Sequence, residues 1–353
     1  EALYQRLFGE PATVEDALAA ARQRLRLATA GSDWAHLQLF SHAEPARGTR
    51  PVTVRPYRGL LRFEPQHARF FFGRDAERDE ALADLAALEA AGRPRFLVVA
   101  GASGTGKSSV VLAGVVPALA ARGTPSLVLR PGRDPLRALG EALAQRPAAG
   151  RFVVVVDQFE EVFTHATAGG PEDARAFARR LWRLAAEAGG PAVIVTLRVD
   201  YLGRCGELEL GDGARLDRVA YDEAHRVFVA QMAPEGMRAA IDGPAARAGL
   251  VLEAGLRERL LAAIGGEPNA LPLLQYTLDE LWARRTDGDA LTNAGLDALG
   301  GPAGALARRA DAVLEAMSQE ERAAARRLLV RMVAYGAAPD SGVRRQVAEA
   351  EVR

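Results

Sequence analysis

One short segment of the chain combines the residue types and the spacing that bind a nucleotide phosphate. In "GASGTGKS", residues 101–108, a glycine is followed by four residues and then by Gly-Lys-Ser, the pattern of a phosphate-binding loop. Gly104 and Gly106 let the backbone turn its N–H groups inward around an anion. Lys107, the one lysine among 45 lysines and arginines, is a compact charge that reaches the β- and γ-phosphates where the planar fork of arginine would not fit. The Ser108 hydroxyl can bind Mg²⁺.

The neighbouring sequence supports this interpretation of the loop. An apolar, β-branched run at 95–100 precedes it and a helical pattern at 107–121 follows it, so the loop joins a strand to the positive end of a helix dipole. A chance match in a glycine-rich loop is the alternative, and for this composition roughly one match in a thousand such chains is expected. The residues expected around the phosphates are Gly101, Ser103, Gly104, Thr105, Gly106, Lys107, Ser108 and Ser109.

Acidic residues at the end of a second apolar run could supply the metal ligand and the base of a hydrolysis reaction. Asp157 follows four valines in "RFVVVVDQFEEVF", where an α/β sheet presents ligand-binding groups, and we expect it to hold Mg²⁺ through water. Glu160 and Glu161 follow it by three and four residues, and either could orient and deprotonate an attacking water. The alternative is that this pair begins a solvated helix.

An arginine ends a third apolar run and could detect the γ-phosphate. The run "AVIVTLR" ends at Arg198. We expect this strand to lie between the strand that precedes the loop and the strand that precedes Asp157. From that place the guanidinium could reach the γ-phosphate and act in catalysis. The alternative is an ordinary surface arginine.

The elements that must position these residues follow an alternating pattern. Near-continuous apolar strands separated by helices predict a parallel sheet that is covered on both faces. The expected strands are 95–100, 126–130, 151–156, 192–197 and 226–231, and the helices between them are 107–121, 135–146 and 172–188. From about residue 234 the strand pattern stops, and helices are expected at 235–242, 254–264, 271–285, 303–317 and 319–335, the last opened by a capping box of Ser318 and Glu321.

The composition argues against several other classes of protein. With a formal net charge of zero, the chain has no overall field that would attract nucleic acid or an anionic membrane, and no apolar run approaches the roughly 20 residues of a membrane span. The single cysteine, Cys205, excludes an internal disulfide framework and suits a reducing cytoplasm. Because it starts at Glu1, the chain is expected to be a fragment of a longer protein. The histidines lack metal-ligand spacing and are expected at the surface or at helix caps: His36, His42, His67, His165 and His225.

Taken together, these segments resemble the STAND class of signal-transduction NTPases, and in particular the bacterial novel STAND NTPase domain. The resemblance covers residues 56–335 and rests on "FFFGR", "DQFEEVFT" and "LPLLQ" beside the loop. It implies an α/β P-loop NTPase fold of the ASCE and AAA+-like type, with ATP or ADP and Mg²⁺ as cofactors. It also implies that Phe72, Gly73 and Arg74 lie beside the adenine and that Pro272 packs near the nucleotide. NB-ARC relatives usually have a glycine where this chain has Ala270, and from the residues alone Pro272 would simply open a helix.

The resemblance also implies a division of the chain into parts. Residues 1–50, with a helical pattern at 14–28 and a strand pattern at 34–40, resemble the end of a caspase-like CHAT peptidase, and a generic helical linker is the alternative. The further parts expected are a linker and adenine-side segment at 51–94, an NTPase core at 95–233, a helical lid at 234–290 and the start of a winged-helix-like module at 291–353.

The function implied by the resemblance is a nucleotide-controlled signalling switch. ADP would hold the lid closed, ATP would favour an open state that self-oligomerises, and slow hydrolysis would reset the switch. An effector and a repeat-type sensor, such as WD repeats, would lie outside this fragment, in bacterial defence or cell-death signalling in the cytoplasm. A non-hydrolysing nucleotide-bound scaffold and a small-molecule kinase are the alternatives. No membrane or direct nucleic-acid partner is expected, and the basic stretch at 325–335 is expected to pack inside the winged-helix-like module.

Overall fold

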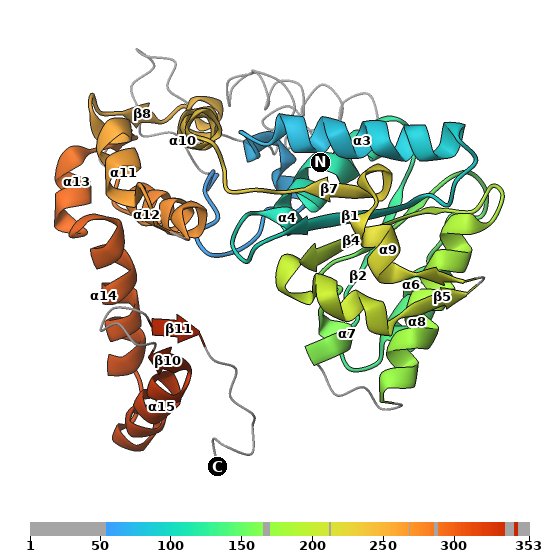
Figure 1. The fold of residues 1–353 in the computed structure, drawn as a ribbon. Helices are drawn as coiled ribbons and strands as arrows, with labels where there is room; N and C mark the ends of the chain where they lie inside the picture. The colour runs from blue at the N-terminus through green and yellow to red at the C-terminus, as the bar shows by residue number, and fades with distance from the viewer. Residues whose placement is uncertain are drawn as a thin grey trace, which may run out of the picture.

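The computed structural model describes residues 54–164, 170–211, 213–267, 269–285, 289–335 and 342–344 (Figure 1). An α/β core comes first along the described chain, and a mainly helical region follows it. The helix expected at 14–28, the strand expected at 34–40 and the resemblance of residues 1–50 to a caspase-like domain lie outside the described residues. Within the described ranges, none of the helices combines the length and the hydropathy that crossing a lipid bilayer requires.

Five parallel strands form the central sheet. They are β1 (Phe96–Gly101), β2 (Ser126–Leu129), β3 (Val153–Val156), β4 (Ala192–Arg198) and β7 (Arg226–Phe228). Their order across the sheet is β2-β3-β4-β1-β7, with every neighbouring pair parallel. β4 therefore lies between the strand that precedes the phosphate-binding loop and the strand that precedes Asp157, which confirms the predicted order. β7 ends earlier than expected, because after Val229 N donates to Ala100 O at 2.7 Å the chain leaves the sheet edge.

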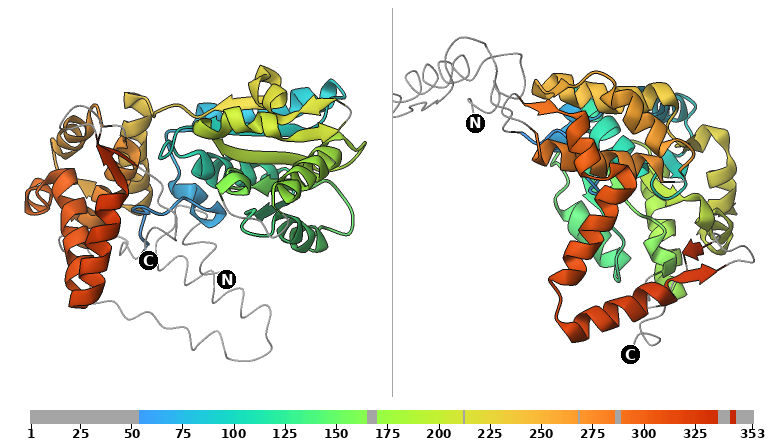
Figure 2. Two further views of the ribbon diagram at one scale, coloured as in Figure 1. Left: turned by 60° about the horizontal axis from the view of Figure 1, so that its bottom comes forward. Right: turned by 90° about the vertical axis from the view of Figure 1, so that its left-hand side faces the viewer.

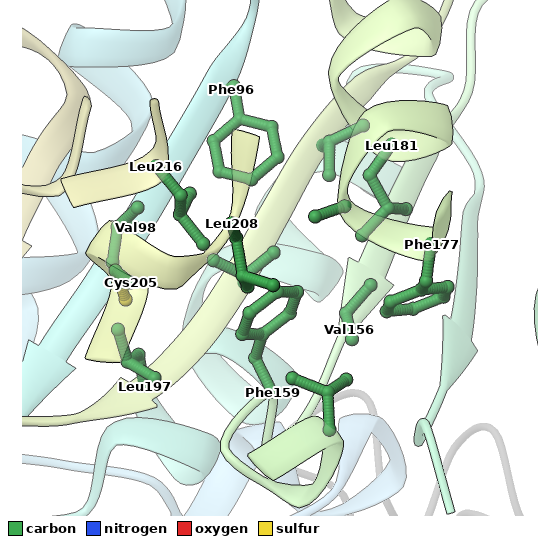
Figure 3. Packing of buried hydrophobic residues seen from close by; sticks show 14 of the residues in the cluster. Phe96, Val98, Val156, Phe159, Phe177, Leu181, Leu197, Cys205, Leu208 and Leu216 are labelled. Atoms are coloured by element: carbon green, nitrogen blue, oxygen red, sulfur yellow. The ribbon is translucent and has the colours of Figure 1, made fainter. Parts of the chain in front are cut away.

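Alternate strand residues pack into two hydrophobic cores, one on each face of the sheet. The covering helices are α3 (Asp75–Ala90), α6 (Pro135–Ala144) and α8 (Pro171–Ala186). Phe96 and Val98 of β1 belong to the core under α6 and α8, where the rings of Phe159 and Phe177 stack (Figure 3). Their neighbour Leu97 belongs to the opposite core, under α3. Every residue of β1 and β3 is buried, as expected for a parallel sheet covered on both faces.

The helix that follows the phosphate-binding loop is continuous but changes its winding. It comprises α4 (Lys107–Ser109), a π-helical segment (Val110–Val115) and α5 (Val116–Ala121), so the helix predicted at 107–121 is confirmed. All residues of the π-helical segment are buried. Pro117 follows this segment and has no N–H to donate to the carbonyl one turn earlier, which accounts for a local departure from α-helical bonding.

The region after the sheet is mainly helical and has its own hydrophobic core. Its helices are α10 (Pro234–Ala248), α11 (Leu256–Ile264), α12 (Ala270–Ala283) and α13 (Asn293–Ala298). The prediction that no strands follow residue 234 is wrong, since β8 (Val251–Leu252) and β9 (Ala290–Leu291) pair in parallel within this region. Runs of two residues are too short to produce a visible alternation in sequence. The helix expected to end at residue 242 continues through Pro244 to Ala248, and the next residue, Gly249, caps it with a left-handed φ of 81°.

Two long helices and a hairpin end the described chain. α14 (Gly301–Glu315) and α15 (Gln319–Arg331) project from the rest of the molecule (Figure 2). The capping box predicted at α15 is confirmed, because Glu321 N donates to Ser318 Oγ at 3.2 Å and Ser318 N donates to Glu321 Oε2 at 2.9 Å. The helix expected to reach residue 335 ends at Arg331, and the β-branched and aromatic stretch that follows forms β10 (Val333–Tyr335), which pairs antiparallel with β11 (Gly342–Arg344).

Several short elements that the sequence patterns did not predict connect β4 to β7. They are a 3₁₀ segment (Val199–Glu207), β5 (Glu209–Gly211), β6 (Ala214–Arg215), α9 (Leu216–Tyr221) and a 3₁₀ turn (Glu223–His225). Cys205 lies in the first of them and is fully buried, and burial raises the pKa of its thiol to about 12. His225 is also buried, with Nδ1 2.7 Å from Phe96 O, so the expectation of a surface or capping histidine is wrong there. His67 does cap, since its Nδ1 accepts from Glu64 N at 3.1 Å.

Candidate nucleotide-binding site

A cleft of about 490 Å³ lies where the carboxyl ends of the central strands meet the helical region. Residues of the phosphate-binding loop, the acidic segment after β3, the end of β4, and α10 and α12 contribute to its walls, as does a segment before the sheet at 59–63. The residues singled out in the sequence that line it are Phe72, Arg74, Ser103, Gly104, Gly106, Lys107, Ser108, Ser109, Glu160, Glu161, Arg198 and Pro272. Those that do not line it are Gly73, Gly101, Thr105 and Asp157.

The loop at 101–108 adopts a conformation that depends on glycine. Gly104 and Gly106 have φ values of 79° and 94°, a region that L side chains rarely adopt. Lys107 is 8% exposed, and its Nζ donates to the carbonyl oxygen of Ala102 at 2.6 Å. Burial lowers the pKa of Lys107, and the charge of Glu160 opposes that shift. An ammonium at the wall of a cleft that is bonded, among the described residues, to the carbonyl of Ala102 can still donate to an anion, which is the chemistry of phosphate binding.

Arg74 holds the loop in place through hydrogen bonds of its guanidinium. Its Nη2 donates to Thr105 O and to Ala230 O, both at 2.8 Å, and its Nη1 pairs with Glu77. The guanidinium therefore joins the loop to the chain that leaves β7, and this use of Arg74 was not predicted. Gly73 has a close-packing role as well, because a Cβ there would lie 2.3 Å from Gly236 O of α10.

Aromatic and apolar side chains form another part of the cleft wall, called here the aromatic end. Phe70, Phe71 and Phe72 line it together with Met232 and Ala240. The Phe72 ring lies directly against α10, because a Cβ added at Gly243 would lie 2.4 Å from Phe72 Cγ. A flat apolar group such as a base can bind between such walls.

Asp157 is fully buried at the end of β3, and both of its carboxylate oxygens have partners. Thr196 Oγ1 donates to Oδ1 at 2.9 Å and itself accepts from Gln158 N at 2.8 Å. Arg62 Nη1 pairs with Oδ2, and Arg130 Nη2 lies 3.4 Å from the same oxygen. Sequence patterns missed both Thr196 and Arg62. A threonine inside an apolar strand is a faint signal of a buried polar contact, whereas Arg62 carries no signal among so many arginines.

The donor groups of Ser108, in the cleft wall, and of Asp157, buried at the end of β3, fit a hard divalent cation. Ser108 lines the cleft and offers a hydroxyl, and Asp157 offers the buried carboxylate. The described residues contain no group of three or more His, Cys, Asp or Glu side chains that could hold a metal by themselves. A Mg²⁺ ion bound by Ser108 and Asp157 would therefore take its remaining oxygen ligands from phosphates and water, as this small cation does in phosphoryl-transfer sites.

Glu160 and Glu161 both line the cleft but differ in their surroundings. Glu161 Oε2 accepts from Gly132 N at 3.0 Å, which ties it to the loop after β2. Glu160 Oε2 is buried and has no hydrogen-bond partner among the described residues. Burial raises the pKa of Glu160, opposed by hydrogen bonds from the backbone of Glu160 and of Arg198 and by the charges of Lys107 and Arg198. Glu161 also opens the short helix α7 (Glu161–Thr164), so the two interpretations of the acidic pair are compatible.

Arg198 lies beside the start of the phosphate-binding loop. In the pairing of β1 with β4, Arg198 is opposite Gly101, and its side chain lines the cleft. The guanidinium pairs with Asp200, and its Nε is buried without a partner among the described residues. The side chain thus lines the cleft and carries a buried donor that is unsatisfied within the described residues.

The helical region closes directly over the loop. A Cβ placed at Gly104 would lie 3.1 Å from Pro272 Cγ, and one placed at Gly106 would lie 3.3 Å from Leu271 Cδ2. α12 begins at Ala270, two residues before Pro272, so Pro272 does not open the helix as the residues alone suggested but lies in its first turn, next to the loop. Gln275, one turn later, lines the cleft with a buried Oε1 that has no partner among the described residues.

Comparison with known proteins identifies the family. The sequence profile described as Novel STAND NTPase 1 matches residues 56–353, whereas no curated protein matches the chain. Similar solved structures include the RuvB Holliday junction branch migration motor of Thermotoga maritima, at 15% identity and a TM-score of 0.40 over 65% of this chain and 70% of that chain. A Walker-type ATPase of Pyrococcus abyssi has 13% identity and a TM-score of 0.43, covering 72% of this chain and 79% of that chain. A chain of the HORMA–CdnC–Trip13 complex of E. coli has 17% identity and a TM-score of 0.46, covering 68% of this chain and 92% of that chain.

The family match, the parallel sheet and the glycine-dependent loop are consistent with one another. The matched residues 56–353 include the loop, the acidic segment after β3 and the helices that close over the cleft. This chain belongs to the novel STAND NTPases, and its α/β core is that of a nucleotide-dependent P-loop NTPase.

Proposed function

We propose that this chain is an ATP-hydrolysing switch in which the helical region acts as a lid that responds to the bound nucleotide. The observation that carries the proposal is the composition of the cleft. Lys107 of the loop, Glu160 after β3, Arg198 at the end of β4 and Pro272 of α12 all line the same 490 Å³. A nucleotide that fills this cleft touches core and lid together, so its affinity depends on how the lid is placed.

The proposed roles in hydrolysis follow from the surroundings of each side chain. Lys107 and Arg198 bring positive charge to the phosphates, and Glu160, whose buried Oε2 has no hydrogen-bond partner in the described part of the chain, is the base that orients and deprotonates water. Glu161 positions the loop at Gly132. When bound, Mg²⁺ neutralises phosphate charge, and Ser108 and Asp157 are the residues that would hold it.

Further parts of the proposal rest on the family resemblance. Adenine is the expected base at the aromatic end of the cleft. The "NKxD" pattern that reads guanine needs a lysine, and the one lysine of this chain is already in the phosphate-binding loop. Slow turnover, a closed lid with ADP, self-oligomerisation with ATP, an attached effector and sensor, and a cytoplasmic role in bacterial defence are all proposed on the same ground. The winged-helix-like character of residues 291–353 is proposed too, and the hairpin of β10 and β11 after α15 is compatible with it.

Equilibrium binding of a fluorescent ADP tests the nucleotide site. Lys107→Ala removes the buried ammonium, and a charge-assisted contact of this kind contributes about 1.5–3 kcal/mol, or roughly 10- to 100-fold in affinity. Arg78→Ala in α3, a partly buried arginine that does not line the cleft, is the control and should bind like the parent. Equal affinity of the Lys107→Ala protein and the parent would remove the basis of the proposal.

Phosphate release distinguishes the switch from a non-hydrolysing scaffold. The scaffold is favoured by one observation, the pairing of Arg62 with the metal-binding carboxylate of Asp157. If the chain hydrolyses ATP, Glu160→Gln should bind ATP like the parent and lower the rate of phosphate release by roughly 100-fold or more. Glu161→Gln is the matched neighbour and should keep most of the rate. A parent that retains nucleotide without releasing any phosphate would support the scaffold.

A further inference from the structure

A segment ahead of the sheet places a cation on the carboxylate that is expected to bind metal. We call residues 55–63 the strap. Arg62 of the strap lines the cleft and its Nη1 pairs with Asp157 Oδ2, across 95 residues of sequence. The next residue is anchored as well, because Phe63 N donates to Ser109 Oγ at 3.1 Å. The strap thus touches both elements that carry the proposed Mg²⁺ ligands, the end of β3 and the helix after the loop.

Asp157 needs a positive partner at Oδ2. The residue is fully buried, and a buried carboxylate without a compensating charge is strongly unfavourable. Oδ1 is satisfied by Thr196, so the charge must be balanced at Oδ2. Arg62 supplies this balance at closer range than Arg130, whose Nη2 is 3.4 Å away. In a P-loop NTPase that holds Mg²⁺-nucleotide, the metal supplies it instead.

Arg62 and Mg²⁺ are alternative partners for this carboxylate. A guanidinium and a divalent cation at one oxygen repel each other at short range in a region of low dielectric constant. A site for the displaced side chain already exists, since Glu64 Oε1 lies 3.6 Å from Arg62 Nε and is more exposed. Arg62 can therefore leave Asp157 without losing every carboxylate partner.

The other end of the strap is attached to the lid. Arg55 pairs with Asp279 of α12, with Nη2 2.7 Å from Oδ2, and Tyr57 Oη donates to Ile241 O of α10 at 2.8 Å. Gly59 lies so close to α12 that a Cβ there would be 2.6 Å from Asp279 Oδ2. A movement of Arg62 away from Asp157 therefore acts on a segment that is bonded to both lid helices.

We propose that Arg62 is a built-in competitor of Mg²⁺ at Asp157, so that metal-bound nucleotide displaces it and loosens the strap that joins core and lid. The proposal rests on the proposed function, because it requires a nucleotide site at the loop. It makes Arg62 the residue that sets how strongly nucleotide binding depends on metal. It also gives the lid a direct connection to the metal end of the cleft.

The test compares nucleotide binding with and without metal in three proteins. The dissociation constant for fluorescent ADP is measured in Mg²⁺ and in EDTA for the parent, for Arg62→Gln and for Arg58→Gln, a control in the same strap whose side chain does not line the cleft. The ratio of the EDTA value to the Mg²⁺ value should rise about tenfold in Arg62→Gln, since removing one buried charge contact changes binding by about 1.4 kcal/mol or more. The ratio in Arg58→Gln should stay at the parent value.

The contrary outcomes are distinct. An unchanged ratio of the two dissociation constants in Arg62→Gln overturns the competition. If the ratio is unchanged because affinity falls equally in both buffers, Arg62 is a phosphate ligand instead. A parent that binds no ADP in either buffer refutes the proposed nucleotide site itself. ADP binding in EDTA tests the nucleotide site at the loop, and the ratio of dissociation constants tests the competition by Arg62. The two proposals therefore fail in different ways.

A second measurement needs no variant and therefore does not depend on how Arg62→Gln folds. Trypsin cuts after arginine only when the side chain can enter its specificity pocket, and Arg62 is held on Asp157. Cleavage between Arg62 and Phe63, followed by mass spectrometry, should become faster with ADP and Mg²⁺ than with ADP and EDTA. Cleavage after the exposed Arg137 of α6 is the internal control. Equal rates after Arg62 in the two conditions would contradict the release of the strap.

Discussion

Neighbouring residues of the same type have different chemistry here because their partners differ. Glu160 and Glu161 are adjacent carboxylates in the wall of one cleft. Glu161 is bonded to Gly132 N, whereas Glu160 keeps a buried oxygen without a partner in the described part of the chain. A carboxylate oxygen that has no hydrogen-bond partner can accept a proton from a bound water, and one that is already bonded accepts it less readily.

The pKa of Glu160 predicts the acid side of the pH profile for hydrolysis. Burial raises that pKa above its ordinary value of 4.5, and the base works only when it is ionised. As pH falls through the raised pKa, Glu160 takes up a proton and the rate falls, so the decline should begin at a higher pH than for an exposed glutamate. Single-turnover phosphate release measured across pH checks this.

The matched control for the pH profile is the neighbouring residue. Glu161→Gln should keep the acid limb at the same pH, whereas the residual rate of Glu160→Gln should lack it. An acid limb that persists in Glu160→Gln would assign the titration to another group.

At the scale of elements, close packing of helix against loop shapes the aromatic end of the cleft. α10 has a glycine, Gly243, where it meets the Phe72 ring, and another, Gly236, where it meets the backbone of Gly73. Such contacts leave no space for a side chain. α10 therefore holds Phe72 in place, although the sequence pattern of the helix carried no sign of this contact.

Gly243→Ala should weaken both the fold and nucleotide binding. Alanine normally favours a helix by up to about 1 kcal/mol, but here its Cβ would lie 2.4 Å from Phe72 Cγ, and overpacking of this kind costs about 1–3 kcal/mol. Denaturant unfolding should report a loss of stability, and ADP affinity should fall several-fold because Phe72 must move. Gly140→Ala in α6 is the matched control, since an added Cβ there meets nothing within 4 Å, and it should be neutral or stabilising. Equal behaviour of the two variants would show that the contact is not tight.

At the scale of the whole molecule, core and lid are joined through the cleft and the strap. Their main hydrophobic cores are separate, so what couples them is polar contact, the shared cleft walls and a small apolar cluster around Phe63 and Phe70, against which Ala248 of α10 packs. Leu271 and Pro272 touch the loop, and Arg55 ties the strap to Asp279. A ligand that fills the cleft should therefore stabilise both parts at once.

Thermal unfolding followed by two tryptophans tests this coupling. Trp182 packs on Phe96 in the core, and Trp282 lies under Arg285 in the lid, with 4.3 Å between guanidinium and ring. At about 100 times its dissociation constant, ADP with Mg²⁺ adds about 2.7 kcal/mol, which raises a midpoint by roughly 5–10 °C. With Trp34 replaced by phenylalanine and either remaining tryptophan kept as the reporter, both midpoints should rise by the same amount. Lys107→Ala should abolish the rise in both midpoints. A midpoint reported by Trp282 that does not change with nucleotide would exclude the lid from the site.

How much was predictable varied with the range of the interaction. The phosphate-binding loop, the buried strands and the capping box of Ser318 depend on neighbours a few residues away, and spacing and periodicity report such neighbours directly. The place of β4 between β1 and β3 was also predictable, because a P-loop core leaves few arrangements for its strands. Strands of two residues, such as β8, gave no pattern to detect.

By itself, the sequence determined which local elements form and which side chains could bind phosphate and metal. The tertiary structure alone decided how these side chains are partnered: Arg74 bonds to the loop at Thr105 O, Arg62 pairs with Asp157, Glu161 bonds to Gly132, and Glu160 has one oxygen with no partner among the residues that the structure describes. The physical reason is that a hydrogen bond or ion pair depends on position to within a few tenths of an ångström. Arg62 and Asp157 lie 95 residues apart, and only the path of the folded chain brings such residues to that distance.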